Sequence, residues 1–170
     1  MTARIRARRA VAGDAEWLAE SDRDPDVQPW IGGDDAERHR ERIAAETQLT
    51  LILEDAGTAV GYALITDLDE PHANRQIRRL VLVRRAQGYG RVLLDMSVGA
   101  CFGLLGAHRC WLDALSDNAR AIALYRRYGF VEEGTRRGCY FKDGRYRDLV
   151  VFSLLPPECP ATAWRHLRLD

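Results

Sequence analysis

The chain has 170 residues, of which 46% are hydrophobic and 29% charged, and its formal net charge is zero. These values indicate a globular chain with a core of its own, and they exclude collagen, coiled coil and disorder as descriptions of the whole. No apolar run approaches the roughly 18 residues that a membrane-spanning helix needs, and no apolar stretch follows the basic start. We therefore expect a cytoplasmic protein with no membrane partner, made of one domain at residues 1–155 and a C-terminal tail at residues 156–170.

The charges are distributed unevenly along the chain. Residues 14–70 carry 16 acidic and 4 basic side chains, whereas residues 71–170 carry 9 acidic and 17 basic ones. Such asymmetry indicates that the second half binds an anion and that a cation approaches the first half. A solvated surface is the alternative interpretation, because most charge runs are solvated. No basic stripe with interleaved aromatic residues is present, which argues against a nucleic-acid partner.

The cysteines and histidines are not spaced as metal ligands. Cys101, Cys110, Cys139 and Cys159 form no C-x-x-C pair, and the four histidines add no zinc spacing to them. We expect free, mostly buried thiols and no metal ion.

Hydrophobic periodicity predicts the elements in chain order. Asp14 is expected to cap the first helix with its side chain, and an irregular loop carrying Trp30 follows that helix. The order β-α-α-β-β-β-α-β-α-β-β indicates an α/β domain with a mixed, mostly antiparallel sheet flanked by helices. Strands are expected at residues 4–8, 48–55, 59–69, 76–83, 109–115, 130–137 and 146–155, and helices at residues 15–24, 35–46, 91–105 and 119–128.

A glycine-bearing loop joins the strand at 76–83 to the helix at 91–105. Backbone N–H groups at a helix N-terminus face an approaching anion, and glycine lets that anion come close to the backbone. Arg84, Arg85 and Arg91 add positive charge at the same point. The segment predicts a phosphate or pyrophosphate cradle, with a tight β-to-α turn as the alternative. Neither a Walker A loop nor the dinucleotide-binding fingerprint is present, because the residues that those motifs require after the glycines are missing.

The helix at 119–128 carries a second pattern. Asn118 and Tyr125 lie seven residues apart, which is two helical turns, so both face the same way. The alternative is a helix cap followed by a core tyrosine, and a buried tyrosine still requires a hydrogen-bond partner.

These two segments together resemble the motifs of the GNAT acyl-CoA-dependent N-acetyltransferases. The element order agrees over nearly the whole chain, and pieces of residues 134–155 resemble the branch with ribosomal-protein N-terminal and small-amine acetyltransferases. The resemblance implies the GNAT fold and acetyl transfer from acetyl-CoA to a primary amine, by direct attack in a ternary complex. The amine would belong to a small molecule or to a protein or peptide N-terminus. The matching motifs are Gln87-Gly88-Tyr89-Gly90-Arg91-x-Leu93-Leu94 and Asp117-Asn118-x-x-Ala121-x-x-Leu124-Tyr125-x-x-x-Gly129-Phe130.

The resemblance also implies roles for individual residues. Asn118 would hydrogen-bond the pantetheine arm or the acetyl group, and Tyr125 would protonate the leaving thiolate; both are the implied catalytic residues. Arg126 or Arg127 would reach a nucleotide phosphate, with a solvated helix face as the alternative. The residues implied for cofactor binding are Val81, Leu82, Val83, Gln87, Gly88, Tyr89, Gly90, Arg91, Val92, Asn118 and Tyr125.

The sequence departs from the family at the general base. Many relatives carry a glutamate where this chain has Gln76, and glutamine accepts no proton. Another residue is then the base, or the acceptor amine has a low pKa and bulk water suffices. The candidates are Asp67, Asp69, Glu70, Asp113 and, through water, His72, each of which is also read as a turn or strand residue without a catalytic role.

Trp30 and Gln76 are the candidate acceptor-binding residues. Trp30 stands within a run of carboxylates that would attract a cationic amine, on which the ring would stack. Solvated loop carboxylates around a core tryptophan are the alternative. The carboxylates are Asp22, Asp24, Asp26, Asp34, Asp35 and Glu37.

Two functions follow from these patterns. The first is an N-acetyltransferase, and the second is a catalytically weak acyl-CoA-binding sensor or scaffold that lost its base at Gln76. Retention of Asn118 and Tyr125 favours the enzyme. The resemblance also allows for a homodimer.

Overall fold

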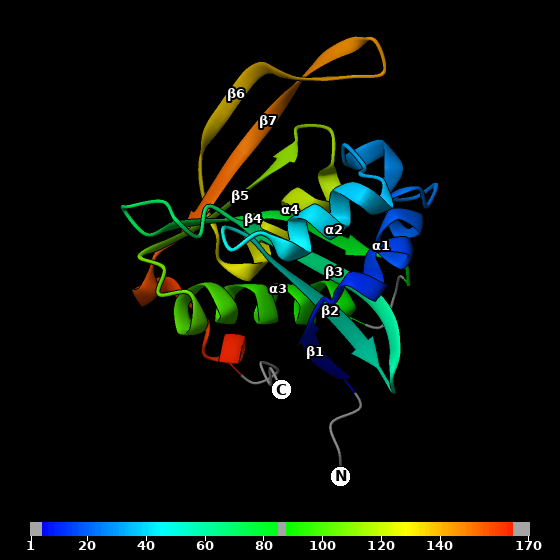
Figure 1. Ribbon diagram of the computed structural model, residues 1–170. Coiled ribbons are helices and arrows are strands. Elements are labelled where there is room, and N and C mark those ends of the chain that lie inside the picture. Colours follow the sequence, from blue (N-terminus) through cyan, green and yellow to red (C-terminus); the bar gives the residue numbers. More distant parts are fainter. Residues whose placement is uncertain (1–4, 85–87, 165–170) are drawn as a thin grey trace.

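The computed structural model describes residues 5–84 and 88–164, and its elements follow the predicted order (Figure 1). The strands are β1 (Ile5–Arg9), β2 (Leu49–Asp55), β3 (Thr58–Thr66), β4 (Asn74–Leu82), β5 (Arg109–Leu115), β6 (Val131–Lys142) and β7 (Arg145–Leu154). The helices are α1 (Ala15–Asp22), α2 (Ala36–Ala44), α3 (Tyr89–Gly99) and α4 (Ala119–Tyr128).

All seven strands form one sheet, in the order β1-β2-β3-β4-β5-β7-β6. Neighbouring strands are antiparallel except for β4 and β5, which run parallel. The predicted α/β class and the mixed, mostly antiparallel sheet are therefore confirmed.

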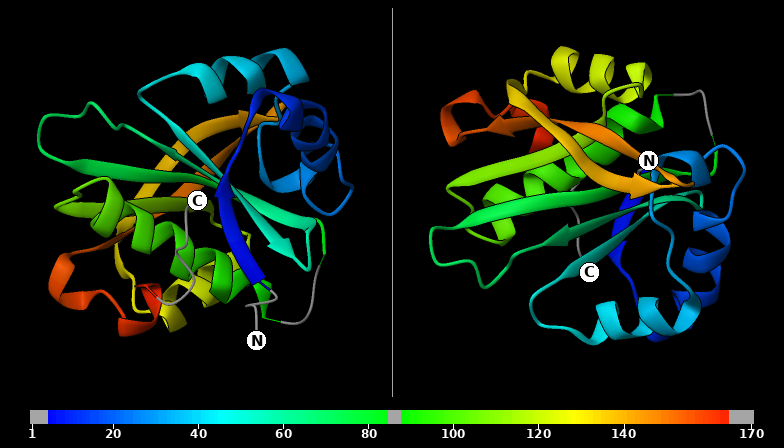
Figure 2. Two further views of the ribbon diagram at one scale, coloured as in Figure 1. Left: turned by 60° about the horizontal axis from the view of Figure 1, so that its bottom comes forward. Right: turned by 90° about the horizontal axis from the view of Figure 1, so that it is seen from above.

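The helices cover both faces of the sheet (Figure 2). On one face, Leu18 of α1 packs with Ile52 and Tyr62 of the central strands. On the other face, Leu94 of α3 and Ile122 of α4 belong to the largest buried cluster. A ligand bound near α3 and α4 therefore lies on the opposite side of the sheet from α1 and α2.

The parallel strands β4 and β5 diverge along their length. Their pairing covers only Asn74–Gln76 against Arg109–Trp111, although β4 continues to Leu82. The register of β4 against β3 also shifts at Arg78, which is a β-bulge. Gly61 pairs with Leu82 at the end of β4, where an added Cβ would lie 2.5 Å from the carbonyl oxygen of Val81. The divergence opens the sheet and leaves backbone groups of β4 without a strand partner on that side.

Three predicted details differ in the structure. The third helix starts at Tyr89 and gives way after Gly99 to a π-helical turn, Ala100–Leu104, so it is shorter than expected. Strand β6 is longer than predicted, β7 is shifted by one residue at the same length, and the two form a hairpin that projects from the sheet (Figure 1). Asp14 does not cap α1 with its side chain: a 3₁₀ turn precedes the helix, and the carboxylate turns back to accept a hydrogen bond from the Val11 amide at 2.7 Å.

The described part of the C-terminal tail packs against α3. Ala163 is fully buried, and the Thr162 hydroxyl donates a hydrogen bond to Asp95 at 2.9 Å. All four cysteines are free, as predicted, but only Cys101 and Cys110 are buried. Within residues 5–84 and 88–164, no helix has the length and apolarity that crossing a bilayer requires.

Candidate active site

A cavity of about 580 Å³ opens where β4 diverges from β5, between the N-terminus of α3 and the inner face of α4. It brings together two motifs that are separated by about 30 residues in the sequence. Most of the residues implied for cofactor binding lie in its wall, namely Val81, Leu82, Gly88, Tyr89, Gly90, Arg91, Asn118 and Tyr125.

Three of the implied residues are not found in this wall. The Val83 amide donates to the carbonyl of Val60 at 3.1 Å and so extends the sheet. Val92 packs on a buried cluster beneath α3, because it lies on the side of the helix that faces the sheet. Gln87 lies outside the described residues.

The N-terminus of α3 forms one end of the cavity. Gly88 is the N-cap residue and adopts a φ of +77°, a left-handed conformation that glycine favours. A Cβ added at Gly90 would lie 3.3 Å from Leu124 Cδ2, so a larger side chain would enter the space between α3 and α4. Because the first-turn amides of a helix have no intrahelical acceptor, they and the helix dipole favour an anion here.

Arginines surround the same end of the cavity. Arg120 and Arg127 line it, and neither forms a hydrogen bond or ion pair with any described residue. Arg126 instead binds Glu132 at 2.6 Å and does not line the cavity, whereas Arg127 does. Arg91 stacks on the ring of Tyr128, 4.3 Å from its centroid. Three basic residues of the second half, Arg91, Arg120 and Arg127, therefore line this cavity.

The α4 residues Asn118 and Tyr125 face the cavity from its other side. Asn118 Oδ1 caps α4 by accepting the Ala121 amide at 3.2 Å, which leaves the amide hydrogens of Asn118 for a ligand. The Tyr125 ring packs edge-on against Phe152, with 5.7 Å between the ring centroids. Its hydroxyl has no hydrogen-bond partner among the residues described. Burial, together with the charge of Asp113, raises the pKa of Tyr125, so the hydroxyl is protonated at neutral pH and can act as an acid.

The two candidate acceptor residues lie in different places. Trp30 is 38% exposed, lines the cavity from the α1–α2 side and lies near the Arg147 guanidinium, 5.8 Å from the ring centroid. Gln76 is buried and lines neither of the two cavities, because it sits in the part of β4 that is still paired, opposite Trp111. Its side chain accepts a long hydrogen bond from Thr66 at 3.5 Å.

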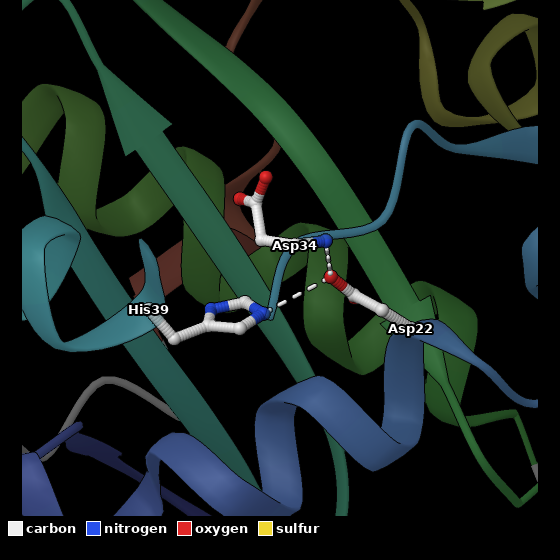
Figure 3. A group of neighbouring side chains, drawn as sticks. All are labelled: Asp22, Asp34 and His39. Carbon is white, nitrogen blue, oxygen red and sulfur yellow. Dashed lines mark hydrogen bonds and ion pairs between the residues drawn. The ribbon is translucent and has the colours of Figure 1, made fainter. Parts of the chain in front are cut away.

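Two of the predicted carboxylates form a buried network rather than a free acidic surface (Figure 3). Asp22 accepts hydrogen bonds from His39 at 3.0 Å, from the Asp34 amide at 2.8 Å and from Tyr62. Arg79 binds both Asp22, at 3.1 Å, and Asp34, at 2.8 Å. Burial acts to raise the pKa of each carboxyl, but these hydrogen bonds and the charge of Arg79 hold both pKa values below their usual range.

The same network contains the one group of metal-binding residue types that the described chain offers, Asp22, Asp34 and His39. Arg42 Nε also donates to Asp34, at 2.6 Å. Two guanidinium groups therefore already neutralise the two carboxylates, and the electrostatics of the group are those of an ion-pair network.

A second cavity, of about 390 Å³, lies between this network and the β6–β7 hairpin. Lys142 and Tyr140 of β6 line it opposite Asp34. Lys142 donates to the carbonyl of Ile31 at 2.5 Å, and Arg147 donates to that of Pro29 at 3.2 Å. The hairpin cations thereby hold the loop that carries Trp30 against the opening in the sheet.

The sequence analysis missed Arg79 and Lys142 as parts of this region. A signal for Arg79 was present, because a charged residue in an otherwise apolar central strand requires a buried partner. Lys142 contacts carbonyl oxygens that lie 111 and 114 positions earlier in the chain, and no local pattern could predict these contacts.

Comparisons with known proteins agree with this geometry. A family model described as "Acetyltransferase (GNAT) family" matches residues 15–130. The spermidine N(1)-acetyltransferase of Vibrio cholerae is 24% identical over 131 residues, which cover 75% of this chain and 76% of that protein. The crystal structure of spermidine N-acetyltransferase from Vibrio cholerae in complex with CoA and spermine has a TM-score of 0.81, with 20% identity, over 91% of this chain and 97% of the other. A dodecameric structure of spermidine N-acetyltransferase from Vibrio cholerae has a TM-score of 0.77 at 20% identity, over 89% and 94%.

Proposed function

Because the chain belongs to the GNAT acetyltransferase family, we propose that it binds acetyl-CoA in the 580 Å³ cavity and uses Tyr125 to transfer the acetyl group to a primary amine. The observation that carries the proposal is the composition of this single cavity. It combines a helix N-terminus for the diphosphate, an unpaired strand end for the pantetheine arm, and Asn118 and Tyr125 for the thioester. The similar Vibrio cholerae structure contains CoA and spermine.

The chemistry follows from these positions. The amine nitrogen attacks the thioester carbon, and the oxyanion that forms is stabilised by hydrogen-bond donors, which contribute a few kcal/mol in such sites. The C–S bond then breaks, and the Tyr125 hydroxyl gives its proton to the thiolate. The absence of a hydrogen-bond partner for this hydroxyl among the described residues supports the role, because the proton is free to move to a ligand.

The acceptor amine reaches the thioester from the α1–α2 side, past Trp30. Two of the carboxylates on this side, Asp22 and Asp34, are already paired with Arg42 and Arg79. We therefore propose a small primary amine as the acceptor, selected by the reacting nitrogen and the apolar rim rather than by a row of acidic groups.

Thiol release with acetyl-CoA and a panel of amines, amino acids and N-terminal peptides tests the function. We expect Tyr125→Phe to lower turnover about 100-fold, the low end of general acid catalysis, with CoA affinity by calorimetry unchanged within about twofold. Tyr146→Phe is the matched control, because that ring is 72% exposed on the hairpin. Tight CoA binding without thiol release for any amine would favour the sensor or scaffold, and equal turnover of Tyr125→Phe and the wild type would remove Tyr125 from its role.

Self-association is a further part of the proposal. The spermidine N-acetyltransferase of Vibrio cholerae has a dodecameric structure. We propose that this chain also forms an oligomer, with the homodimer as its simplest form. Light scattering after gel filtration measures the mass, and a mass of 19.2 kDa, that of one chain, would contradict the proposal.

A further inference from the structure

The C-terminal tail reaches the end of the cavity at which the first turn of α3 lies. The turn Ala161–Trp164 packs against α3, and Ala163 within it is fully buried. Thr162 contacts two side chains of that helix. Its hydroxyl accepts a hydrogen bond from Arg91 Nη2 at 3.0 Å and donates one to Asp95 Oδ1 at 2.9 Å. The tail is thus bound by polar contacts to the first two turns of α3.

Asp95 is the buried centre of this group. Its carboxylate accepts a hydrogen bond from the Tyr128 hydroxyl of α4 at 2.9 Å, in addition to the one from Thr162. A buried carboxylate needs such donors, because an unfilled acceptor away from water costs free energy. The hydroxyl of the tail therefore supplies one of the donors on which this charge depends.

Arg91 and Tyr128 connect the group to the cavity, because both residues line it. The Arg91 guanidinium lies over the Tyr128 ring, 4.3 Å from the centroid. Its Nε is 3.5 Å from Asp95 Oδ1, which is longer than the roughly 2.7–2.9 Å of a direct hydrogen bond between such charged groups. The guanidinium and the carboxylate are therefore bridged mainly by the Thr162 hydroxyl.

A bridging hydroxyl fixes the position of the guanidinium. The hydroxyl of threonine can accept and donate at once, so it satisfies the cation and the anion together. Without it, Asp95 would lack a donor, and Arg91 would close the 3.5 Å gap and move its charge away from the cavity. A side chain that is already held in its binding position also loses less conformational entropy when a ligand arrives.

We propose that Thr162 is a positioning residue for the diphosphate of acetyl-CoA and acts through Arg91; the proposal rests on the function proposed above. With the hydroxyl in place, the guanidinium stands beside the first-turn amides of α3 and binds a phosphate oxygen. Thr162 itself does not touch the ligand. The tail is therefore part of the support of the cofactor site.

The test compares Thr162→Val with the wild type on two acetyl donors. Valine keeps the shape of the side chain and removes both hydrogen bonds. The donors are acetyl-CoA and S-acetylpantetheine, which carries the thioester and the pantetheine arm but no phosphate. With acetyl-CoA we expect kcat/KM to fall about three- to tenfold through KM alone, the loss of about one hydrogen bond. With S-acetylpantetheine the two proteins should agree within about twofold, whereas a general weakening of the fold would lower both values.

A double-mutant cycle with Arg91→Met tests the route of the effect. If Thr162 acts through Arg91, Thr162→Val should reduce CoA affinity by less than about twofold in the Arg91→Met background, as measured by calorimetry. Independent losses that add in the double variant would overturn the proposal. This cycle decides the matter even where S-acetylpantetheine reacts too slowly to measure.

Two further variants complete the experiment. Thr162→Ser keeps the hydroxyl and should restore CoA affinity. Thr135→Val is the matched control, because Thr135 is exposed on β6 and its side chain forms no hydrogen bond with the residues that the structure describes. Equal losses on the two acetyl donors, or an unchanged CoA affinity in Thr162→Val, would overturn the assignment. A wild type that binds no CoA in calorimetry would instead refute the proposed function, so the two failures are distinguishable.

Discussion

The two sides of the opening between β4 and β5 are formed by different kinds of chemical groups. On the α3–α4 side, backbone amides, glycines and the end of a strand form the wall, and its residues come from two continuous segments. On the α1–α2 side, charged side chains from distant elements bind one another: Arg79 of β4 pairs with Asp22 of α1 and with Asp34, and Arg42 of α2 pairs with Asp34. Lys142 of β6 binds a backbone carbonyl oxygen of the loop between α1 and α2.

This difference indicates which side of the opening tolerates changes of side chain and which side does not. A wall of backbone groups tolerates changes in side chains as long as the glycines and the helix start remain. A network of buried charges depends on every member, since removing one leaves the charge of another uncompensated in a medium of low polarity. The acceptor side is thus the more fragile half of the site.

Replacing Arg79 should have the largest effect on stability. Arg79→Met leaves both Asp22 and Asp34 buried without their shared cation, so we expect the free energy of unfolding to fall by about 3–5 kcal/mol. Urea denaturation measures the loss. Arg126→Met, which breaks the exposed pair with Glu132, is the control and should change the unfolding midpoint little. Similar midpoints for the two variants would mean that the buried network is not more fragile than the surface.

Filling the backbone wall should affect binding rather than stability. Gly90→Leu places a side chain between α3 and α4, where Leu124 Cδ2 is 3.3 Å from the added Cβ. We expect CoA affinity to fall about tenfold or more, equivalent to about 1.4 kcal/mol per tenfold step, as measured by calorimetry. Gly13→Leu is the control, because no atom lies within 4 Å of an added Cβ there. Unchanged CoA affinity in Gly90→Leu would contradict the placement of the ligand.

The same contrast explains what could be predicted from the sequence. The strand with the glycine loop, and the helix with Asn118 and Tyr125, are each continuous segments, and their periodicity and caps are local properties. The order of the elements, the type of sheet and most residues of the cavity wall could therefore be predicted. The pairing of Arg79 with Asp22 joins residues 57 positions apart and depends on how α1 packs over β4. The general base could be narrowed only to five candidates, because the distance of a side chain from the cavity is a property of the folded chain, and none of the five lines either of the two cavities described above.

Acid should weaken the fold through the carboxylates of the network. Because the pKa of Asp34 is lowered in the folded protein, its contribution to stability is complete above the unfolded value of about 3.9 and is lost as the pH falls through the folded value. Asp34→Asn lacks this contribution. We therefore expect the free energy of unfolding of the variant to decline less steeply than that of the wild type below about pH 4. If the free energies of unfolding of variant and wild type declined in parallel, Asp34 would have the same pKa in the folded and the unfolded protein.

The smallest expected effect concerns the choice of acceptor: we expect no preference for spermidine over a monoamine. Spermidine and a monoamine of similar length differ in the number of positive charges, and an acceptor side with free carboxylates would favour spermidine strongly, with a preference that weakens as salt is added. Here Arg42 and Arg79 neutralise Asp22 and Asp34, so we expect the two kcat/KM values to agree within about threefold and to respond equally to salt. Asp34→Asn, with its remaining arginines uncompensated, should then disfavour spermidine relative to the monoamine. A strong, salt-sensitive preference of the wild type for spermidine would mean that exposed carboxylates such as Asp35 govern acceptor choice and that the buried network supports only the fold.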